Sequence, residues 1–252
     1  MTTTDRIAIV TGTSSGIGAA LAAQLLSRGW DVLGVARRTP GIADPRYRHL
    51  ALDLTDVPAT VAAFEREVDP RLRDARWRRV ALVNNAAIIG KLARVPALEP
   101  EDLLDSYAAN VAVPTWLMGF VVGRAPEGAA LRIVNVSSGA AVHPVPGLAE
   151  YCGSKAALRM TGMVLAAELD ARDRPAGRAT DVAILSYAPG TVDTPMQAVA
   201  RSQTSDVFPS AEMFRGFAAQ GELVPPTAPA AEIVRFLESA REPRFAERRL
   251  GG

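Results

Sequence analysis

Short apolar runs alternate with longer amphipathic segments along most of this 252-residue chain. The short runs are rich in Val, Ile, Leu and Ala and are bounded by Gly, Asn or Ser, as is typical of strands that a parallel sheet buries on both faces. The longer segments carry apolar residues at helical spacing. This alternation predicts a doubly wound three-layer α/β sandwich of the Rossmann type with a mostly parallel central sheet. The expected strands are 6–10, 31–35, 47–52, 80–83, 131–138 and 179–186.

Helices are expected between the strands, at 19–28, 57–68, 98–119, 151–172 and 229–240. Gly29 is a natural C-cap for the first of these helices, and Asp56 is a natural N-cap for the second. The long mixed segment 195–226 contains scattered Met and Phe residues, which favours a substrate lid over a packed pair of surface helices. The tail 241–252 has no apolar run, so we do not expect a seventh strand there.

Composition favours one domain spanning 1–252 and excludes several classes of protein. Hydrophobic residues make up 48% of the chain and the formal net charge is +1, without the basic excess of a nucleic-acid-binding protein. Cys152 is the only cysteine, which excludes an intrachain disulfide. No apolar stretch approaches the roughly 20 residues of a membrane span. The first strand begins at Arg6, which leaves no room for a signal peptide, so we expect a cytoplasmic protein.

A glycine-rich turn links the first expected strand to the first expected helix. The run Thr11-Gly-Thr-Ser-Ser-Gly-Ile-Gly18 places glycines at Gly12, Gly16 and Gly18. Glycine lets a backbone approach a pyrophosphate closely, and a helix N-terminus offers free N–H groups and a positive dipole end. Within a strand–turn–helix–strand unit this pattern predicts a dinucleotide phosphate site. The alternative is simply a tight turn between strand and helix.

Two arginines, Arg37 and Arg38, follow the second expected strand. Many NAD-binding units carry an acid at this place, which holds the ribose hydroxyls. An acid would repel a 2′-phosphate, whereas an arginine pairs with it through charge-assisted hydrogen bonds. Ser14 and Ser15 can add hydroxyl donors to the same phosphate. We therefore expect NADP(H) in preference to NAD(H), with a solvated arginine turn as the alternative.

Tyr151 and Lys155 stand four residues apart on an expected helix and therefore share a face. A nearby ammonium favours the phenolate of a tyrosine, whose unperturbed pKa is about 10. Ser138 ends an upstream apolar run and can hold an oxygen on which charge develops. Such a pair is by itself more often a solvated helix face, so its interpretation depends on the motifs that precede it.

In combination, these motifs resemble the short-chain dehydrogenase/reductase family from the first strand to about residue 195. The glycine spacing matches that family, and Asn84-Asn-Ala-Ala87 differs from its Asn-Asn-Ala-Gly pattern by Ala87 in place of glycine. Asp193-Thr-Pro-Met-Gln197 and Tyr151-Cys-Gly-Ser-Lys155 are most similar to the sepiapterin reductase and benzil reductase branch, which reduces carbonyls and vicinal dicarbonyls. The tail 241–252 departs from sepiapterin reductases in lacking their acid-bearing end, so a pterin substrate is not expected.

The resemblance implies four catalytic residues. The family's spacing of thirteen residues before the tyrosine selects Ser138 as the partner of the carbonyl oxygen. The same resemblance makes Tyr151 the proton donor and gives Lys155 two tasks, lowering the pKa of the tyrosine and binding the nicotinamide ribose. An asparagine at the place of Asn110 holds a water in a proton relay.

The resemblance also implies the cofactor contacts. Asp53 is implied as an acceptor from the adenine amino group, and a carboxylate that only organises the strand-end turn is the alternative. The implied contacts come from Gly12, Ser14, Ser15, Gly16, Ile17, Gly18, Arg37, Arg38, Asp53, Leu54, Asn85, Ala86, Ala87, Tyr151, Lys155, Pro189, Gly190, Val192 and Thr194.

We therefore expect an NADPH-dependent enzyme that reduces a ketone, aldehyde or vicinal diketone, reversibly, without a metal, nucleic acid or membrane partner. The helices at 98–119 and 151–172 resemble those that pair subunits in the family, which implies a homodimer or homotetramer. Three alternatives stay open at this point. They are a non-catalytic NADPH-binding regulator, an epimerase or dehydratase on the same frame, and a dehydrogenase that works mainly as an oxidant.

Overall fold

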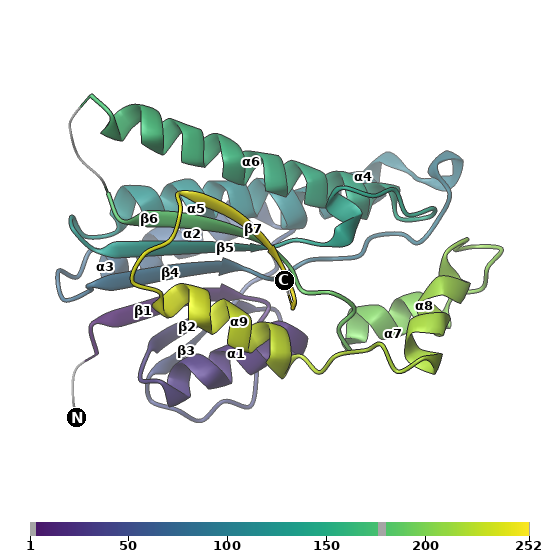
Figure 1. Cartoon of the computed structure of the whole chain (residues 1–252), viewed down its shortest axis with the longest axis horizontal. Coiled ribbons are helices and arrows are strands. Elements are labelled where there is room, and N and C mark those ends of the chain that lie inside the picture. The colour runs from purple at the N-terminus through teal and green to yellow at the C-terminus, as the bar shows by residue number, and fades with distance from the viewer. Residues whose placement is uncertain (1–3, 176–179, 252) are drawn as a thin grey trace.

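A computed structural model describes residues 4–175 and 180–251 and has a seven-stranded sheet at its centre (Figure 1). The strands are β1 (Arg6–Thr11), β2 (Asp31–Ala36), β3 (Tyr47–Ala51), β4 (Arg79–Asn84), β5 (Ala130–Val136), β6 (Val182–Ala188) and β7 (Phe245–Arg249). Their order is β3-β2-β1-β4-β5-β6-β7, and every neighbouring pair is parallel. The expected doubly wound α/β fold and its six expected strands are confirmed, except that Ala179, the first residue of the expected strand 179–186, lies outside the described residues.

Helices cover both faces of the sheet. They are α1 (Gly16–Ser27), α2 (Val57–Ala63), α3 (Asp69–Leu72), α4 (Pro100–Tyr107), α5 (Val113–Arg124), α6 (Ala149–Asp173), α7 (Pro195–Ser202), α8 (Ala211–Ala219) and α9 (Thr227–Glu238). Two π-helical turns, Phe64–Val68 and Ala108–Ala112, and two 3₁₀ turns, Val95–Ala97 and Gly139–Ala141, complete the helical structure described. Among these described helices, none combines the length and the apolar character needed to cross a bilayer.

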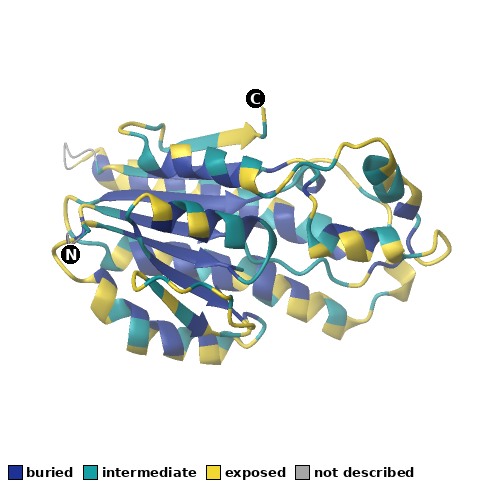
Figure 2. Cartoon of the chain, turned by 90° about the horizontal axis from the view of Figure 1, so that it is seen from below, coloured by how far each residue is buried: buried dark blue, intermediate teal, exposed yellow. Residues whose placement is uncertain are grey.

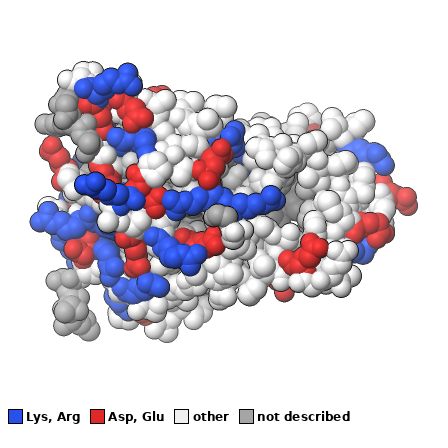
Figure 3. All heavy atoms as spheres, in the orientation of Figure 1, with Lys and Arg blue, Asp and Glu red and all other residues white. Residues whose placement is uncertain are grey.

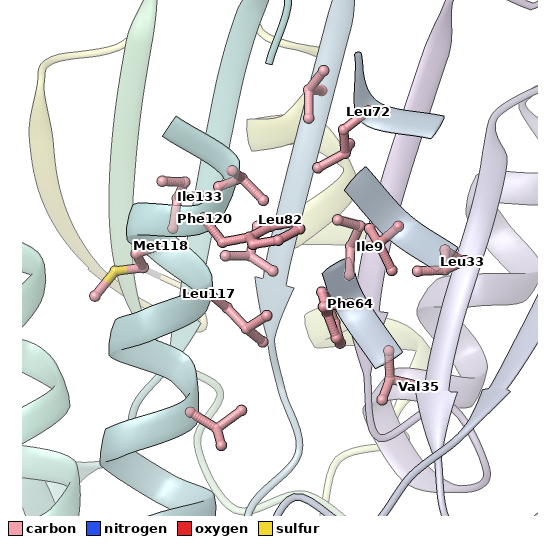
Figure 4. Packing of buried hydrophobic residues seen from close by; sticks show 14 of the residues in the cluster. Ile9, Leu33, Val35, Phe64, Leu72, Leu82, Leu117, Met118, Phe120 and Ile133 are labelled. Atoms are coloured by element: carbon pink, nitrogen blue, oxygen red, sulfur yellow. The ribbon is translucent and has the colours of Figure 1, made fainter. Parts of the chain in front are cut away.

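Side chains alternate between the two faces of the sheet and build a separate core on each. Ile9 and Leu82 point to the face covered by α2, α3, α5 and α6, where they pack in one cluster with Phe64 (Figure 4). Val10 and Val83 point to the opposite face, against α1 and α9. Figure 2 shows the result, with buried strands and exposed residues on the outer sides of the helices. Because helices pack on both faces of the sheet, the carboxyl ends of the strands form a rigid edge that can position the residues of a site.

The crevice expected of such a sheet lies at the carboxyl ends of β1 and β4. The chain runs outward from β1 through β2 to β3, and then returns to the other side of β1 to form β4. This reversal separates the two connections and opens a crevice where doubly wound folds bind their ligands. In Figure 1, α7 and α8 extend beyond this edge of the sheet.

The helix expected at 98–119 begins at Pro100 and continues to Arg124 as α4, a π-helical turn and α5. The π-helical turn was not expected. Pro114 has no N–H to donate to the carbonyl of Asn110 four residues earlier, so the regular hydrogen-bond ladder is interrupted at this point. Asn110 thus sits in the middle of a helix at a turn of wider spacing.

A seventh strand is present, so the expectation that residues 241–252 form none is wrong. β7 pairs in parallel with β6, from Ile184 opposite Phe245 to Ala188 opposite Arg249. An edge strand has one neighbour and is often charged, so it needs few apolar residues. Phe245 and Ala246 pack against the two cores, while the rest of the strand is exposed. A search for apolar runs misses such a strand.

The segment 195–226 forms the helices α7 and α8 and lies over the carboxyl edge of the sheet. A bridge between Val192 and Val224 closes its base. Phe208, which follows α7, packs with Leu148 at the start of α6 in a small separate hydrophobic cluster. The segment therefore has its own apolar support and is positioned against the elements that carry the predicted catalytic residues.

Candidate active site

A cavity of about 870 Å³ runs along the carboxyl edge of the sheet, between the strand ends and the segment 195–226. On the face shown in Figure 3, the surface near this junction is mostly uncharged, whereas charged side chains crowd the opposite end of the molecule. Gly18 and Asn110 are the two predicted site residues that do not line the cavity. Those that line it are Gly12, Ser14, Ser15, Gly16, Ile17, Arg37, Arg38, Asp53, Leu54, Asn85, Ala86, Ala87, Ser138, Tyr151, Lys155, Pro189, Gly190, Val192 and Thr194.

The turn between β1 and α1 has the geometry of a phosphate cradle. Gly12 has a φ of +79°, and a Cβ there would lie 2.7 Å from the side-chain nitrogen of Asn85. A Cβ at Gly18 would overlap the carbonyl oxygen of Gly12. Ser15 caps α1 without a side-chain hydrogen bond, and the first turn contains no acid. The helix N-terminus therefore presents free N–H groups to the cavity, and these residues fit the pyrophosphate of a dinucleotide.

Two asparagines tie the strand ends together beside this turn. Asn84 donates from Nδ2 to Oδ1 of Asn135 at 2.9 Å, which joins β4 to β5. Asn85 donates to the carbonyl of Thr11 at 2.8 Å, which joins β4 to β1. These contacts hold the carboxyl ends of β1, β4 and β5 together. Ala87 lines the cavity at the position where the family pattern has glycine.

The far end of the cavity carries the basic pair. The Arg37 side chain is 67% exposed, and its guanidinium lies 3.5 Å from a carboxylate oxygen of Asp53. Arg38 is exposed and forms no hydrogen bond or ion pair with the described residues. Hydrogen bonds from Thr55, led by its backbone N–H, lower the pKa of Asp53. Asp53 thus organises the strand-end turn and faces the cavity at the same time.

The three central residues meet at one wall of the cavity. Ser138 follows β5, while Tyr151 and Lys155 lie in the first turns of α6. The Lys155 ammonium is buried and lies 5.6 Å from the centre of the Tyr151 ring. It donates a 2.8 Å hydrogen bond to the carbonyl of Val136. The structure therefore brings together the three side chains that the sequence spacing grouped.

The protonation states of this group follow from burial. Burial raises the pKa of Tyr151 to about 12, against a smaller lowering by the hydrogen bond with Ser138. Burial also lowers the pKa of Lys155 to about 8. The expectation that Lys155 lowers the pKa of the phenol stays a prediction, because the ammonium is directed at the Val136 carbonyl here and lost solvation dominates the pKa of Tyr151. At pH 7 the phenol is neutral and the amine is mostly protonated.

Asn110 acts on this wall from behind. Its Nδ2 donates to the carbonyl of Ile88 at 2.8 Å and to Oγ of Ser154 at 3.1 Å. Its Oδ1 accepts from the N–H of Ile88 at 2.9 Å. The side chain is fully buried and joins the π-helical turn to the loop after β4 and to α6. It therefore fixes the turn of α6 between Tyr151 and Lys155.

Glu150 supports this wall from the side away from the cavity, and the sequence did not reveal it. It precedes Tyr151, is 1% exposed, and accepts hydrogen bonds from the backbone N–H of Lys91 and, at 2.9 Å, from Oγ of Ser106. These contacts fasten the start of α6 to α4 and to the loop after β4. A glutamate at the start of a helix is ordinary in sequence, so only the tertiary contacts identify its role.

Arg249 was also missed, because it belongs to the unexpected strand β7. It lines the main cavity and a smaller side cleft of about 280 Å³ that adjoins it at Ser138. His143 lines the side cleft, and is not among the described residues that line the main cavity.

Comparison with known sequences agrees with the site. The sequence profile of the short chain dehydrogenase family matches residues 6–205. A benzil reductase of Bacillus subtilis that forms (S)-benzoin is 30% identical over 235 residues, which cover 93% of this chain and 94% of that protein. A sepiapterin reductase of Xenopus laevis is 35% identical over 221 residues, which cover 79% of this chain and 78% of that protein.

Comparison with solved structures gives the same result. The KRED1-Pglu enzyme matches 96% of this chain and 100% of its own, with a TM-score of 0.79 and 25% identity. A short-chain dehydrogenase/reductase from Burkholderia vietnamiensis matches 77% of this chain and 88% of its own, with a TM-score of 0.62 and 34% identity. The chain therefore belongs to the short-chain dehydrogenase family, in the branch of the benzil and sepiapterin reductases, and is an oxidoreductase that acts between carbonyl and alcohol groups.

Proposed function

We propose that this enzyme uses NADPH to reduce a ketone, an aldehyde or a vicinal diketone, with Tyr151 as the proton donor. The observation that carries the proposal is the convergence of Ser138, Tyr151 and Lys155 on one wall of a cavity whose other end has a phosphate-fitting turn. The similarity to reductases named for benzil and sepiapterin supports a carbonyl substrate. The physiological direction is reduction in this proposal, and the same groups serve alcohol oxidation in reverse.

The roles divide along the cavity. The β1–α1 turn would hold the pyrophosphate, and the residues from Pro189 to Thr194 would hold the nicotinamide. NADPH supplies the hydride when bound. Ser138 donates a hydrogen bond to the carbonyl oxygen, and Tyr151 transfers its phenolic proton to that oxygen. Lys155 would bind the ribose that adjoins the nicotinamide, and it would return a proton to Tyr151 and take one in turn from a water near Asn110.

The pKa of Tyr151 supports the direction of proton transfer. With a pKa of about 12, the phenol is protonated throughout the neutral range and is a donor rather than a base. The nearby ammonium of Lys155 favours the phenolate that forms once the proton has left. Reduction therefore needs no prior ionisation of the tyrosine.

Replacing Tyr151 tests the mechanism. In Tyr151→Phe, kcat for benzil with NADPH is expected to fall by about 10² to 10⁴, because general acid catalysis contributes that much. The dissociation constant of NADPH should stay within about threefold, since the rest of the cofactor site is intact. Tyr107→Phe is the matched control, because Tyr107 lies on α4 outside the lining of the cavity. Near-normal turnover in Tyr151→Phe would refute the mechanism.

The preference for NADPH rests on the basic pair. Arg38 has no partner among the described residues, and Arg37 has one exposed contact among them, with Asp53. In Arg37→Asp, kcat/KM for NADPH should fall roughly 10- to 100-fold while the value for NADH does not fall, because a carboxylate repels the 2′-phosphate. Arg48→Asp is the matched control on the exposed side of β3. Unchanged use of NADPH in Arg37→Asp would contradict the preference.

We also propose that residues 195–226 close over the substrate and that the single domain forms a homo-oligomer. Exposed apolar side chains on α4 and α6, among them Leu104 at 68% and Met160 at 51%, support pairing through these two helices. Light scattering that showed only monomer would contradict the oligomer.

A further inference from the structure

The side chains of β7 alternate between its two faces, and this places Arg249 on the cavity side. Glu247 faces α6, where its carboxylate is bound by Arg159. Arg248 faces the other way and pairs with Glu242. Arg249, two residues after Glu247, returns to the α6 face. It forms no hydrogen bond or ion pair with any residue that the structure describes, so its guanidinium keeps its full donor capacity.

Arg249 also stands at the catalytic end of the cavity. It lies opposite Ala188 in the sheet, directly before Pro189 and Gly190. A Cβ built on Gly139 would lie 3.5 Å from a terminal nitrogen of its guanidinium. Gly139 is the residue after Ser138, the proposed partner of the substrate carbonyl. The guanidinium therefore lies beside the backbone that directly follows Ser138.

The charge along the cavity is uneven. Among the described residues that line it, Asp53 is the only acid, and it lies at the far end beside Arg37. The catalytic end holds Lys155 and Arg249 and is otherwise lined mainly by apolar side chains, which include Ile89, Val145, Leu148, Met196, Phe214 and Phe217. An anionic group attached to an apolar body matches this end better than a neutral compound does.

We propose that Arg249 binds a carboxylate of the substrate, and that the preferred substrates are 2-oxo acids with an apolar side group. The inference rests on the proposed carbonyl reduction and names its substrate class. The planar guanidinium suits a carboxylate bound through two parallel hydrogen bonds. In a 2-oxo acid the carboxylate is joined directly to the carbonyl carbon, which matches the short separation between Arg249 and the Ser138–Gly139 backbone. Arg249 thus determines specificity and takes no part in proton or hydride transfer.

The test compares two acids with their neutral methyl esters as substrates, each with NADPH. Phenylglyoxylate and 4-phenyl-2-oxobutanoate supply the apolar body. The wild-type enzyme should have the higher kcat/KM for each acid. In Arg249→Met, kcat/KM for the acids should fall roughly 10- to 100-fold, because hydrogen bonds to charged groups have that effect, while the esters change by less than about threefold. Arg249→Lys should retain part of the preference.

Arg235→Met is the matched control. It removes the same single charge from an exposed position on α9, outside the lining of both the cavity and the side cleft. It should leave both substrate classes unchanged. Urea unfolding checks that all three variants are folded.

Three results would overturn the inference. One is a wild-type enzyme that reduces the esters or benzil but not the acids. This result would agree with carbonyl reduction and would exclude 2-oxo acids as the preferred substrates. Another is an equal loss for acid and ester in Arg249→Met together with a weaker dissociation constant for NADPH, which would assign Arg249 to the cofactor. If the wild-type enzyme reduced neither compound class nor benzil, the proposed function would fail and the inference with it.

Discussion

Lys155→Met is expected to inactivate the enzyme and to make it more stable. The lysine is 2% exposed, and burial lowers its pKa from 10.5 to about 8. Because the pKa is lowered, the charged form of Lys155 reduces the free energy of unfolding. We expect the charge to be kept in spite of this because the reaction needs it. Methionine has a similar length and carries no charge, so it removes this cost.

The magnitude follows from the shift in pKa. The fall in the pKa of Lys155 from 10.5 to about 8 corresponds to about 3 kcal/mol, at 1.36 kcal/mol for each pKa unit. This destabilisation of the folded wild type is fully present below pH 8. The variant also loses the hydrogen bond to Val136, which leaves a carbonyl without its partner and costs about 1 kcal/mol. We therefore expect Lys155→Met to unfold with a free energy about 2 kcal/mol higher than the wild type at pH 7.

The dependence on pH separates this effect from improved packing. Between pH 8 and 10.5 the folded wild type loses the proton of Lys155 while the unfolded chain keeps it, so wild-type stability rises by up to about 1.4 kcal/mol per pH unit. The variant lacks this rise, and its advantage should shrink from pH 7 to pH 10 in urea unfolding. Ionisation of Tyr151 contributes equally to both proteins and cancels in the difference. A variant less stable than wild type at pH 7, or an advantage independent of pH, would refute the reasoning.

Two further variants test the glycine-rich turn and the carboxyl end of α6. In Gly18→Ala the new Cβ overlaps the Gly12 carbonyl, so NADPH binding measured by fluorescence should weaken at least about tenfold. Gly119→Ala is the control, because its Cβ meets no neighbour; it should leave NADPH binding unchanged and raise the free energy of unfolding by up to about 1 kcal/mol. Asp173→Asn should lower the urea midpoint at pH 7, because hydrogen bonds led by that of Thr180 hold the pKa of this carboxyl well below its usual range. Its contribution is present above about pH 4 and is lost progressively at lower pH, so the difference from wild type should shrink there, and a difference at pH 2 as large as that at pH 7 would contradict this.

The parts of the site that could be predicted are those where one residue type is physically required. Gly12 adopts a φ of +79°, and Gly18 has no room for a Cβ, so glycine itself signals the geometry of the turn. Tyr151 and Lys155 share a helix face because of their spacing. In these cases a local rule is sufficient, and the tertiary structure agrees with it.

The parts that could not be predicted depend on contacts between distant segments. The pKa of Tyr151 is raised by burial, and the burial of a phenol is not visible in a spacing of four residues. Glu150 is buried by its hydrogen bonds to Lys91 and Ser106, which come from two other segments of the chain. Local sequence cannot reveal a partner that lies 44 residues away, as Ser106 does.

The sequence did not predict β7, and the physical reason for this also concerns the choice of substrate. The central strands must be apolar on both faces, so their pattern is strong and their side chains have little freedom to change. An edge strand is held by backbone hydrogen bonds along one side, and its exposed side chains carry little of the folding free energy. Arg249 can therefore be exchanged without unfolding the sheet, although the parallel register still delivers it to the end of the cavity beside Ser138. A residue that is weakly packed but fixed in position can be exchanged without loss of the fold. Exchange of such residues lets the same catalytic residues act on different substrates.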